Sequence, residues 1–265
     1  MLATAAVGSF RSGFPPCQPS MPNPVDSVLD RLAGWLLPPR CVLCGAPGQR
    51  PVLDLCADCE ADLPRQDSAC PRCALALPAG SPVGECAQCR VDPPPWDRCL
   101  APWRYDFPLA GLIQELKYAG RLPVARVLGT LLARRAAAAD LHLDVDLLLP
   151  VPLHPAKLVE RGFNQSIEIA HWLARGTRRT LVVRGLRRTR ETRPQVGLDL
   201  HERAANLRAA FDVTADFAGR RVAIVDDVMT TGSTVREIAG VLRRGRAARI
   251  DVWCVARAQR VAGTL

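Results

Sequence analysis

Two adjacent carboxylates, Asp226 and Asp227, stand between an apolar run and a loop rich in hydroxyl groups. Residues 222–225 form a short, continuous apolar run, which is typical of a strand buried on both faces of a parallel sheet. The loop consists of Thr230, Thr231, Gly232, Ser233 and Thr234. It offers hydroxyl groups, successive backbone N–H groups and a glycine that permits positive φ. Because open α/β folds bind ligands at the carboxyl ends of their strands, we expect a phosphate in this loop.

The residues after the loop have the spacing of an amphipathic helix. Apolar side chains recur every three to four residues at Val235, Ile238, Ala239 and Leu242. The positive amino end of such a helix would point into the loop and favour an anion. Two acids at a strand end are most often simply solvated. Here they would repel each other and the phosphate unless they faced hydroxyl groups or a divalent ion, so the pattern favours a sugar that carries a phosphate.

The run RVAIVDDVMTTGSTV, residues 221–235, resembles the phosphoribosyl pyrophosphate (PRPP) signature of the type I phosphoribosyltransferases. The resemblance implies that Asp226 and Asp227 hold the ribose hydroxyls. It also implies that the loop from Thr230 to Thr234 wraps the 5′-phosphate and that Mg²⁺ binds together with PRPP.

A second polar segment follows a predicted strand at residues 146–152, whose prolines end the ladder. Residues 153–165 are interpreted as a loop at the same carboxyl edge, followed by a helix. They include Lys157, Arg161 and Asn164, side chains suited to a polyanion such as pyrophosphate. An ordinary polar loop is the alternative.

Eight of the eleven cysteines form four C-x-x-C pairs: Cys41 and Cys44, Cys56 and Cys59, Cys70 and Cys73, Cys86 and Cys89. Each pair can present two sulfurs to one ion, and two pairs complete a tetrahedral site. Four thiolates leave no open position for chemistry, so we expect structural Zn²⁺ in two successive zinc ribbons. Disulfides and an iron–sulfur cluster are alternatives. Sequential pairing is simplest, but crossed sites are possible.

The remaining cysteines, Cys17, Cys99 and Cys254, are interpreted as bystanders. Downstream of the ribbons, short apolar runs alternate with helical periodicity. Strands are predicted at 103–105, 146–152, 181–183, 222–225 and 250–256, and the first helices at 109–120 and from 124 onward. This βα succession predicts an α/β fold with a doubly wound parallel sheet, preceded by a small double zinc ribbon.

Composition shifts suggest three segments. Residues 1–24 read as a disordered tail in which Met21 could be the true start, residues 25–97 as a short helix plus the double zinc ribbon, and residues 98–265 as the α/β domain. Pro93, Pro94 and Pro95 mark the linker. The charged tract at 184–211 could form a mobile lid. The sequence has no apolar run long enough for a membrane helix and no export signal, so we expect a cytoplasmic protein without membrane insertion.

The net charge of +9 also invites a nucleic-acid interpretation. Eight thiolates holding two Zn²⁺ ions would lower that charge by four, to about +5. Residues 175–193 contain eight arginines and one acid. They could grip single-stranded DNA or close over a substrate with several phosphates. Base stacking would depend on a few aromatic residues such as Trp96, Trp103 and Trp172.

Taken in order, the four C-x-x-C pairs, LKYAGRLPVA, VPLHPAKLVERGFNQS, RTRETRPQVGLDLHERAANLRAAF and VAIVDDVMTTGST resemble the ComF family. The resemblance runs from about Cys41 to Ala256. It implies a zinc-ribbon amino domain and a type I phosphoribosyltransferase domain that acts on PRPP, linked to DNA uptake or nucleotide salvage. For some members it implies work on single-stranded DNA beside a helicase-like competence protein, with or without catalysis. Nothing in the sequence identifies the acceptor.

Overall fold

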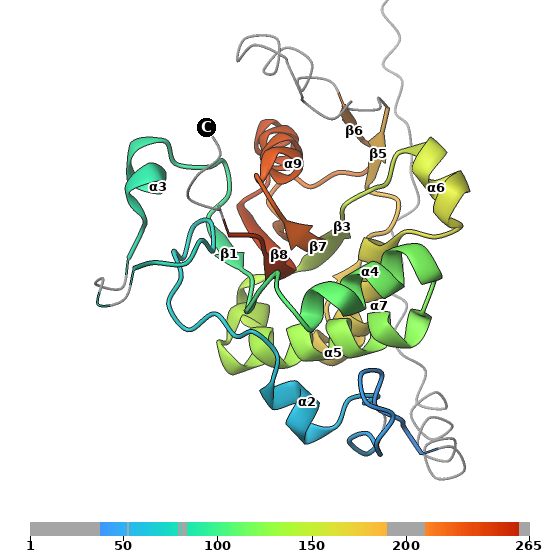
Figure 1. Cartoon of the computed structure of the whole chain (residues 1–265). Helices are drawn as coiled ribbons and strands as arrows, with labels where there is room; N and C mark the ends of the chain where they lie inside the picture. Colours follow the sequence, from blue (N-terminus) through green and yellow to red (C-terminus); the bar gives the residue numbers. More distant parts are fainter. Residues whose placement is uncertain (1–37, 52, 79, 81–83, 190–209, 260–265) are drawn as a thin grey trace, which may run out of the picture.

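A computed structural model describes residues 38–51, 53–78, 80, 84–189 and 210–259. A central sheet carries helices on both faces, and the two cysteine-rich segments lie apart on the outside of this α/β body (Figure 1). The predicted amino-terminal tail, the short helix predicted ahead of the ribbons (residues 25–37), Cys17 and most of the predicted lid fall outside the described residues.

The central sheet is wholly parallel and has the order β1-β8-β7-β3-β4, with β2 paired to β8 beyond β1. Its strands are β1 (Arg98–Leu100), β2 (Trp103–Arg104), β3 (Leu147–Pro150), β4 (Thr180–Leu181), β7 (Arg221–Met229) and β8 (Arg249–Arg257). The parallel α/β sheet predicted from the sequence is therefore confirmed, and β1 is a strand that the sequence analysis did not identify. Two further strands, β5 (Leu186–Arg188) and β6 (Phe211–Val213), form a separate antiparallel pair.

Side-chain alternation along β7 divides the core between the two faces of the sheet. Ala223 and Val225 point to one face, and Val222 and Ile224 point to the other. The first face is covered by α4 (Leu109–Ala119), α5 (Leu122–Ala138) and α7 (Gln165–Thr177), and the second by α9 (Ser233–Arg244). The continuous apolar run is thus explained by burial on both sides.

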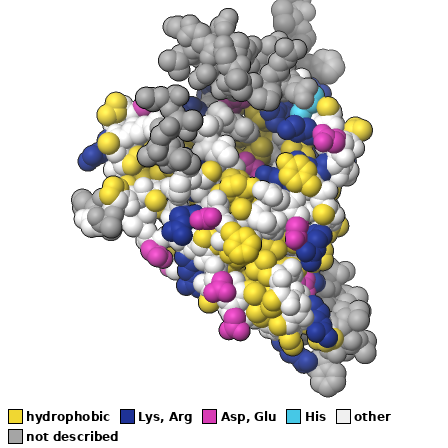
Figure 2. All heavy atoms as spheres, viewed as in Figure 1, with side chains coloured by type: hydrophobic (Ala, Val, Ile, Leu, Met, Phe, Trp, Pro, Cys, Tyr) yellow, Lys and Arg dark blue, Asp and Glu magenta, His cyan; other side chains and the backbone are white. Residues whose placement is uncertain are grey.

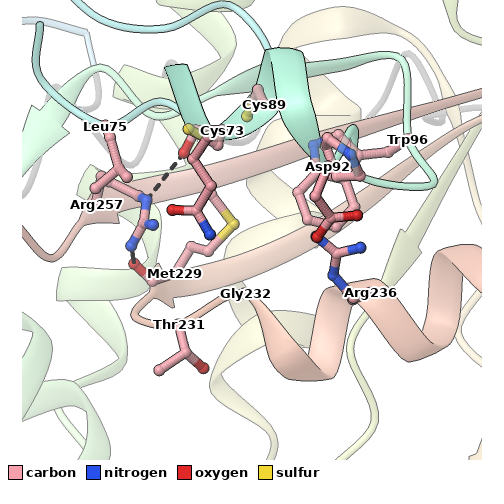
Figure 3. A pocket seen from close by; sticks show the side chains of 12 residues that line it. Cys73, Leu75, Cys89, Asp92, Trp96, Met229, Thr231, Gly232, Arg236 and Arg257 are labelled. Carbon is pink, nitrogen blue, oxygen red and sulfur yellow. Dashed lines mark hydrogen bonds and ion pairs between the residues drawn. The ribbon is translucent and has the colours of Figure 1, made fainter. Parts of the chain in front are cut away.

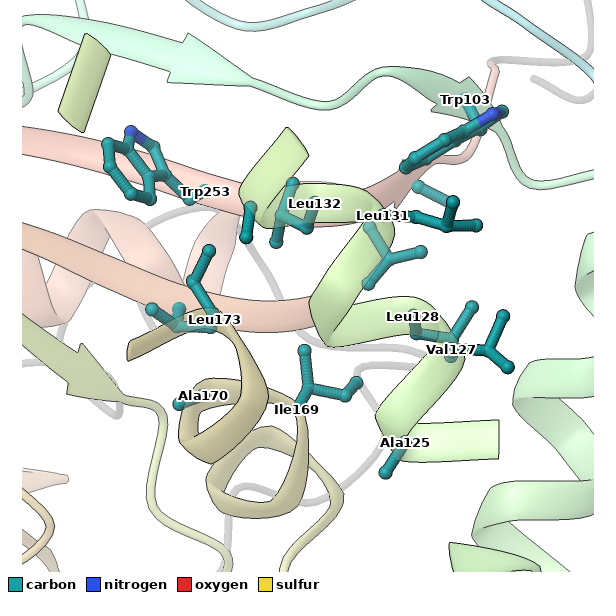
Figure 4. Packing of buried hydrophobic residues seen from close by; sticks show 14 of the residues in the cluster. Trp103, Ala125, Val127, Leu128, Leu131, Leu132, Ile169, Ala170, Leu173 and Trp253 are labelled. Carbon is teal, nitrogen blue, oxygen red and sulfur yellow. The ribbon is translucent and has the colours of Figure 1, made fainter. Parts of the chain in front are cut away.

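Helices α5 and α7 pack closely because a glycine lies at their contact. A Cβ added at Gly129 would lie 2.4 Å from the carbonyl oxygen of Ile169 and 2.7 Å from Trp172 Cβ. Figure 4 shows the resulting layer, in which Leu132 and Leu173 lie next to Trp253 of the sheet and Leu128 lies farther along α5, beside Val127. Among the described residues, no helix is both long and apolar enough to cross a membrane.

The prediction that residues 153–165 form a loop is wrong for part of this segment. It contains a short helix, α6 (Pro155–Arg161), which His154 caps through Nδ1 at 3.3 Å from the Ala156 amide. Pro155 stands at the first turn and Gly162 follows the last, in the left-handed region at φ 80°. This proline-first, glycine-last pattern is a helix signal that could have been recognised from the sequence.

The remaining described elements are a short 3₁₀ helix at Leu141–Asp144 and one short helix in each cysteine-rich segment, α2 (Ala57–Ala61) and α3 (Ala87–Val91). The first segment packs beside α5, and the second lies near β1 and the end of β8 (Figure 1). They therefore lean on different parts of the same α/β body.

Candidate functional site

The acid pair lies where β7 extends past the end of its neighbour β3. The sequence analysis placed the acids after the strand, but β7 continues through them to Met229 because β8 pairs with it as far as Arg257. On the other side, β3 ends at Pro150, opposite Val225. Beyond that point β7 has lost one neighbour, and its next two side chains are Asp226 and Asp227. This opens the carboxyl edge of the sheet at the acids.

Asp226 accepts two hydrogen bonds that hold its carboxylate in place. Ser166 Oγ, in the first turn of α7, donates to its Oδ1 at 2.9 Å, and the Asp227 amide donates to the same oxygen at 3.0 Å. Burial and the neighbouring Asp227 charge nevertheless raise the pKa of Asp226 to about 8. Burial and the neighbouring like charge therefore favour the protonated form of this carboxyl group.

Asp227 is almost completely buried, with 3% of its surface exposed, and it faces a cation from α4. Lys117 Nζ lies 2.5 Å from Asp227 Oδ2, at the distance of an ion pair though without hydrogen-bond angles. The sequence analysis treated Lys117 only as the end of a helix. Two signals could have singled it out: it is one of only two lysines in the chain, and it lies in the block LKYAGRLPVA that carries the family resemblance.

The predicted phosphate loop leads from β7 into α9 and keeps most of its amides available. Thr231 Oγ1 lies 3.0 Å from Ser233 Oγ and accepts from the Ser233 amide at 3.3 Å. No acceptor in the described part of the chain is bonded to the amides of Thr231, Gly232 or Thr234. Gly232 caps α9 at φ 79°, where a side chain would be strained. The loop thus offers free N–H groups at a helix amino end, which is the geometry of an anion site.

The three residues expected to bind pyrophosphate differ in how far their side chains are already engaged in contacts within the protein. Lys157 is exposed on α6. Arg161 donates from Nη1 to Gln165 Oε1 at 2.6 Å, and its guanidinium lies 5.6 Å from the ring centroid of Tyr118. Asn164 is buried, accepts from the Ser166 amide at 2.9 Å and donates to the Val151 carbonyl at 2.9 Å. Its side chain is thus engaged in joining α7 to the end of β3.

The eight paired cysteines form two clusters in sequential order, and within each cluster all four sulfurs lie within 4.8 Å of one another. The Sγ atoms of Cys44 and Cys56, and those of Cys73 and Cys86, are 3.7 Å apart. Tetrahedral Zn–S bonds of about 2.3 Å place neighbouring sulfurs about 3.8 Å apart, so both clusters fit Zn²⁺. The crossed pairing is excluded, and no described cysteine forms a disulfide.

The electrostatics of both clusters suit a cation. Although burial opposes ionisation, N–H groups of Cys56, Cys44 and Leu43 lower the pKa of Cys41 to about 6. The pKa of Cys70 is also lowered, against the effect of burial, by N–H groups that include the Cys86 amide at 3.3 Å. Backbone donors that stabilise a thiolate are what a tetrathiolate site requires.

Two of the three tryptophans considered for base stacking are buried and cannot serve. Trp96 is 3% exposed and Trp103 is 2% exposed, whereas Trp172 is partly exposed beneath two arginines, Arg126 and Arg175. On the face shown in Figure 2, basic side chains are interspersed with acidic ones. Among the described residues on this face, the basic side chains therefore form no continuous stripe of the kind that tracks a nucleic-acid backbone.

The fold and the two clusters define a phosphoribosyltransferase-like protein with an amino-terminal double zinc ribbon. Residues 32–90 match the double zinc ribbon domain, and residues 165–263 match the phosphoribosyl transferase domain. DNA utilization protein YhgH of Salmonella typhi is 37% identical over 231 residues, covering 83% of this chain and 98% of the relative. Competence protein F of Haemophilus influenzae is 33% identical over 229 residues, covering 83% and 97%. The chain belongs to the ComF family.

A solved structure described as the allosteric regulatory enzyme of purine biosynthesis aligns with 49% of this chain and 25% of its own, at 25% identity. Its TM-score of 0.36 is too low to support any functional argument.

Proposed function

We propose that the protein binds PRPP, or a related ribose 5-phosphate compound, with Mg²⁺ at the carboxyl edge of the sheet and transfers its phosphoribosyl group to an acceptor. The observation that carries the proposal is the order acid pair, amide-rich loop and helix start along β7 and α9. These groups match the hydroxyl end and the phosphate end of one ribose 5-phosphate.

Each of these groups is proposed to bind or support a different part of the ligand. Asp226 and Asp227 bind the ribose hydroxyls, Ser166 holds Asp226 in place, and Thr230 to Thr234 bind the 5′-phosphate. Lys117 balances the charge of the buried Asp227. Lys157, on exposed α6, and Arg161 meet the pyrophosphate. Asn164 keeps α7, and with it Ser166, in register with β3.

In the transfer, the bond between the ribose C1 and a pyrophosphate oxygen breaks while a bond from C1 to the acceptor forms. Pyrophosphate leaves with the bonding electrons, and the acceptor loses a proton. Mg²⁺, when bound, compensates the negative charge of pyrophosphate. The protein contributes positioning and charge compensation, as in other phosphate chemistry.

Calorimetry with PRPP and Mg²⁺ tests the proposal. The wild type is expected to bind, and the double variant Asp226→Asn, Asp227→Asn is expected not to bind. Asp140→Asn is the matched control, because Asp140 is exposed at the far end of α5 and has a left-handed conformation, φ 51°, that asparagine tolerates. Equal binding by the wild type and the double variant would refute this assignment of the acids.

The names of the relatives favour a role near DNA, because they refer to DNA utilization and to competence. We therefore propose that the protein acts in the cytoplasm on the path of incoming single-stranded DNA, beside a helicase-like partner. Binding through arginines to the phosphate backbone predicts an affinity that falls steeply with salt. Fluorescence anisotropy with a labelled oligonucleotide at rising salt checks this, and an absent or salt-insensitive interaction contradicts direct DNA binding.

A further inference from the structure

Arg257, the last residue of β8, lies between the second zinc ribbon and the phosphate loop and is only 4% exposed. Its Nε donates to the carbonyl of Cys73, a zinc ligand, at 2.9 Å. Its Nη1 donates to the carbonyl of Met229 at 2.8 Å and also contacts the carbonyl of Thr230. Figure 3 shows the guanidinium between these two segments. One side chain thus ties the C-x-x-C turn of Cys70 and Cys73 to the first peptides of the loop.

These contacts decide where the loop amides point. In a planar trans peptide, the carbonyl and the N–H group of the next residue point in opposite directions. Because the carbonyls of Met229 and Thr230 turn toward Arg257, the amides of Thr230 and Thr231 turn away from it. The Ala258 amide supports the same orientation by donating to the Met229 carbonyl at 3.0 Å. Arg257 therefore fixes the first amides of the loop in the outward direction that a bound phosphate requires.

The same C-x-x-C turn also reaches the middle of the loop, through Trp96. The Trp96 indole donates from Nε1 to the carbonyl of Arg72 at 2.5 Å. Its ring packs on Gly232, where an added Cβ would lie 3.6 Å from Trp96 Cη2. Two successive carbonyls of the turn, those of Arg72 and Cys73, thus engage the two side chains that contact the start and the middle of the loop.

The space between the ribbon and the loop is a supporting contact and not the substrate site. The cavity there, lined by Cys73, Trp96 and Arg257 among others, has a volume of about 50 Å³. That volume suits one or a few water molecules, because a single water needs roughly 10–15 Å³. The ribbon therefore packs on the side of the loop toward which the carbonyls of Met229 and Thr230 turn.

We infer that Arg257 is a positioning residue through which the second zinc ribbon holds the phosphate loop in its binding conformation, so that affinity for the phosphate depends on this ribbon. The inference rests on the proposed function. It concerns the order of the loop, however, and that order can be measured without any ligand.

The test compares Arg257→Lys with Arg126→Lys in the full-length zinc-loaded protein. Lysine keeps the charge but lacks the planar fork that reaches several carbonyls at once. Arg126 is the matched control, because its Nε donates to Asp54 Oδ2 of the first ribbon at 2.9 Å. Zinc content and thermal melting establish that each variant is folded and retains both metal sites.

Two readouts decide the inference: hydrogen exchange of the peptide spanning residues 229–236 without ligand, and calorimetric affinity for ribose 5-phosphate. Arg257→Lys is expected to speed exchange in this peptide and to weaken binding about tenfold, as changes in supporting contacts commonly do. Arg126→Lys is expected to change the affinity by less than about twofold.

Unchanged exchange and affinity in Arg257→Lys would overturn the inference, as would an equal loss in both variants. If the wild type binds neither ribose 5-phosphate nor PRPP, the proposed function fails, and the exchange comparison alone then decides the role of Arg257. Faster exchange that is restricted to Arg257→Lys would still support it.

Discussion

The two zinc ribbons share their ligand type and the position of a short helix, and their cysteine spacing differs by one residue, but they support different parts of the molecule. In the first, Leu53, Leu55 and Leu63 join the core formed with α4 and α5, and Asp54 pairs with Arg126 of α5. The second touches the α/β body at the end of β8 and beside the phosphate loop, through Arg257 and Trp96. Figure 1 shows the two ribbons on different sides of the sheet.

This difference shows that a metal motif acquires its role from the surface on which it packs. A tetrathiolate site has no open position for substrate, so neither ion takes part in chemistry directly. The first ribbon adds apolar burial to a layer of helices away from the loop. The second presents two backbone carbonyls to side chains that contact the loop, so its effect can extend to ligand binding.

Removing one zinc ligand from each ribbon should have the largest effect and should distinguish the role of the first ribbon from that of the second. Cys56 and Cys86 are matched positions, because they occupy the N-cap positions of α2 and α3, where serine is also favoured. Only the Cys56 side chain accepts a capping bond, from the Cys59 amide. Cys56→Ser and Cys86→Ser should each lose one zinc and roughly 4 kcal/mol or more of stability. Only Cys86→Ser should also lose affinity for ribose 5-phosphate, by about tenfold.

Zinc content, chemical denaturation and calorimetry at low temperature, where both variants remain folded, measure these effects. Equal weakening of ligand binding in the two variants would mean that the ribbons act only through overall stability.

Arg126→Met should remove the ion pair between α5 and Asp54 of the first ribbon and leave the proposed ribose 5-phosphate site intact. Asp54 is 6% exposed, so losing its cation leaves a buried charge without compensation. Because the Arg126 side chain is 31% exposed, water reduces the loss to about 2 kcal/mol. Urea denaturation checks the stability, and a change of more than about twofold in ribose 5-phosphate affinity would contradict the separation of the two ribbons.

The positions of the local groups of the candidate site could be predicted from the sequence, while their binding roles stay predictions. The cysteine pairs, the acid pair and the phosphate loop are short patterns, in which neighbouring residues along the chain are also neighbours in space. The parallel sheet also followed from local evidence, since strands buried on both faces read as continuous apolar runs.

Contacts between distant segments could not be predicted in this way. Lys117 meets Asp227, and Arg257 meets Cys73, only because the sheet and helices bring them together. In a chain with so many arginines, composition gave no reason to single out Arg257. Asn164 shows the converse, because a polar residue beside a predicted site can be engaged entirely within the fold. The binding site for the acceptor of the proposed transfer could not be predicted, since no local sequence pattern marks it.

The acid pair predicts a pH dependence opposite in sign to that of the ribbons, whose thiolate ligands are favoured as pH rises. The native pKa of Asp226 is about 8, above the ordinary value of 3.8, so the folded state binds more protons than the unfolded state between these values. Stability therefore falls as pH rises through this window. Asp226→Asn has no titrating carboxyl group at this position. Its free energy of unfolding relative to that of the wild type should therefore rise by roughly 1 kcal/mol from pH 6 to pH 7. Denaturation at both pH values measures the gain, and a difference that stayed constant or narrowed would contradict the raised pKa.

The smallest expected effect concerns a surface contact of the second ribbon. Arg236 of α9 lies 3.3 Å from Asp92, but 46% and 67% of their side chains are exposed. Water screens such a pair, so Arg236→Gln should cost less than about 0.5 kcal/mol. Arg236 also stacks on Trp96 at 5.9 Å, yet the bond from Trp96 to Arg72 remains after the substitution. Affinity for ribose 5-phosphate should thus change by less than about twofold. A tenfold loss in calorimetry would instead assign the coupling between ribbon and loop to Arg236 and the first turn of α9, in place of the buried carbonyl contacts of Arg257.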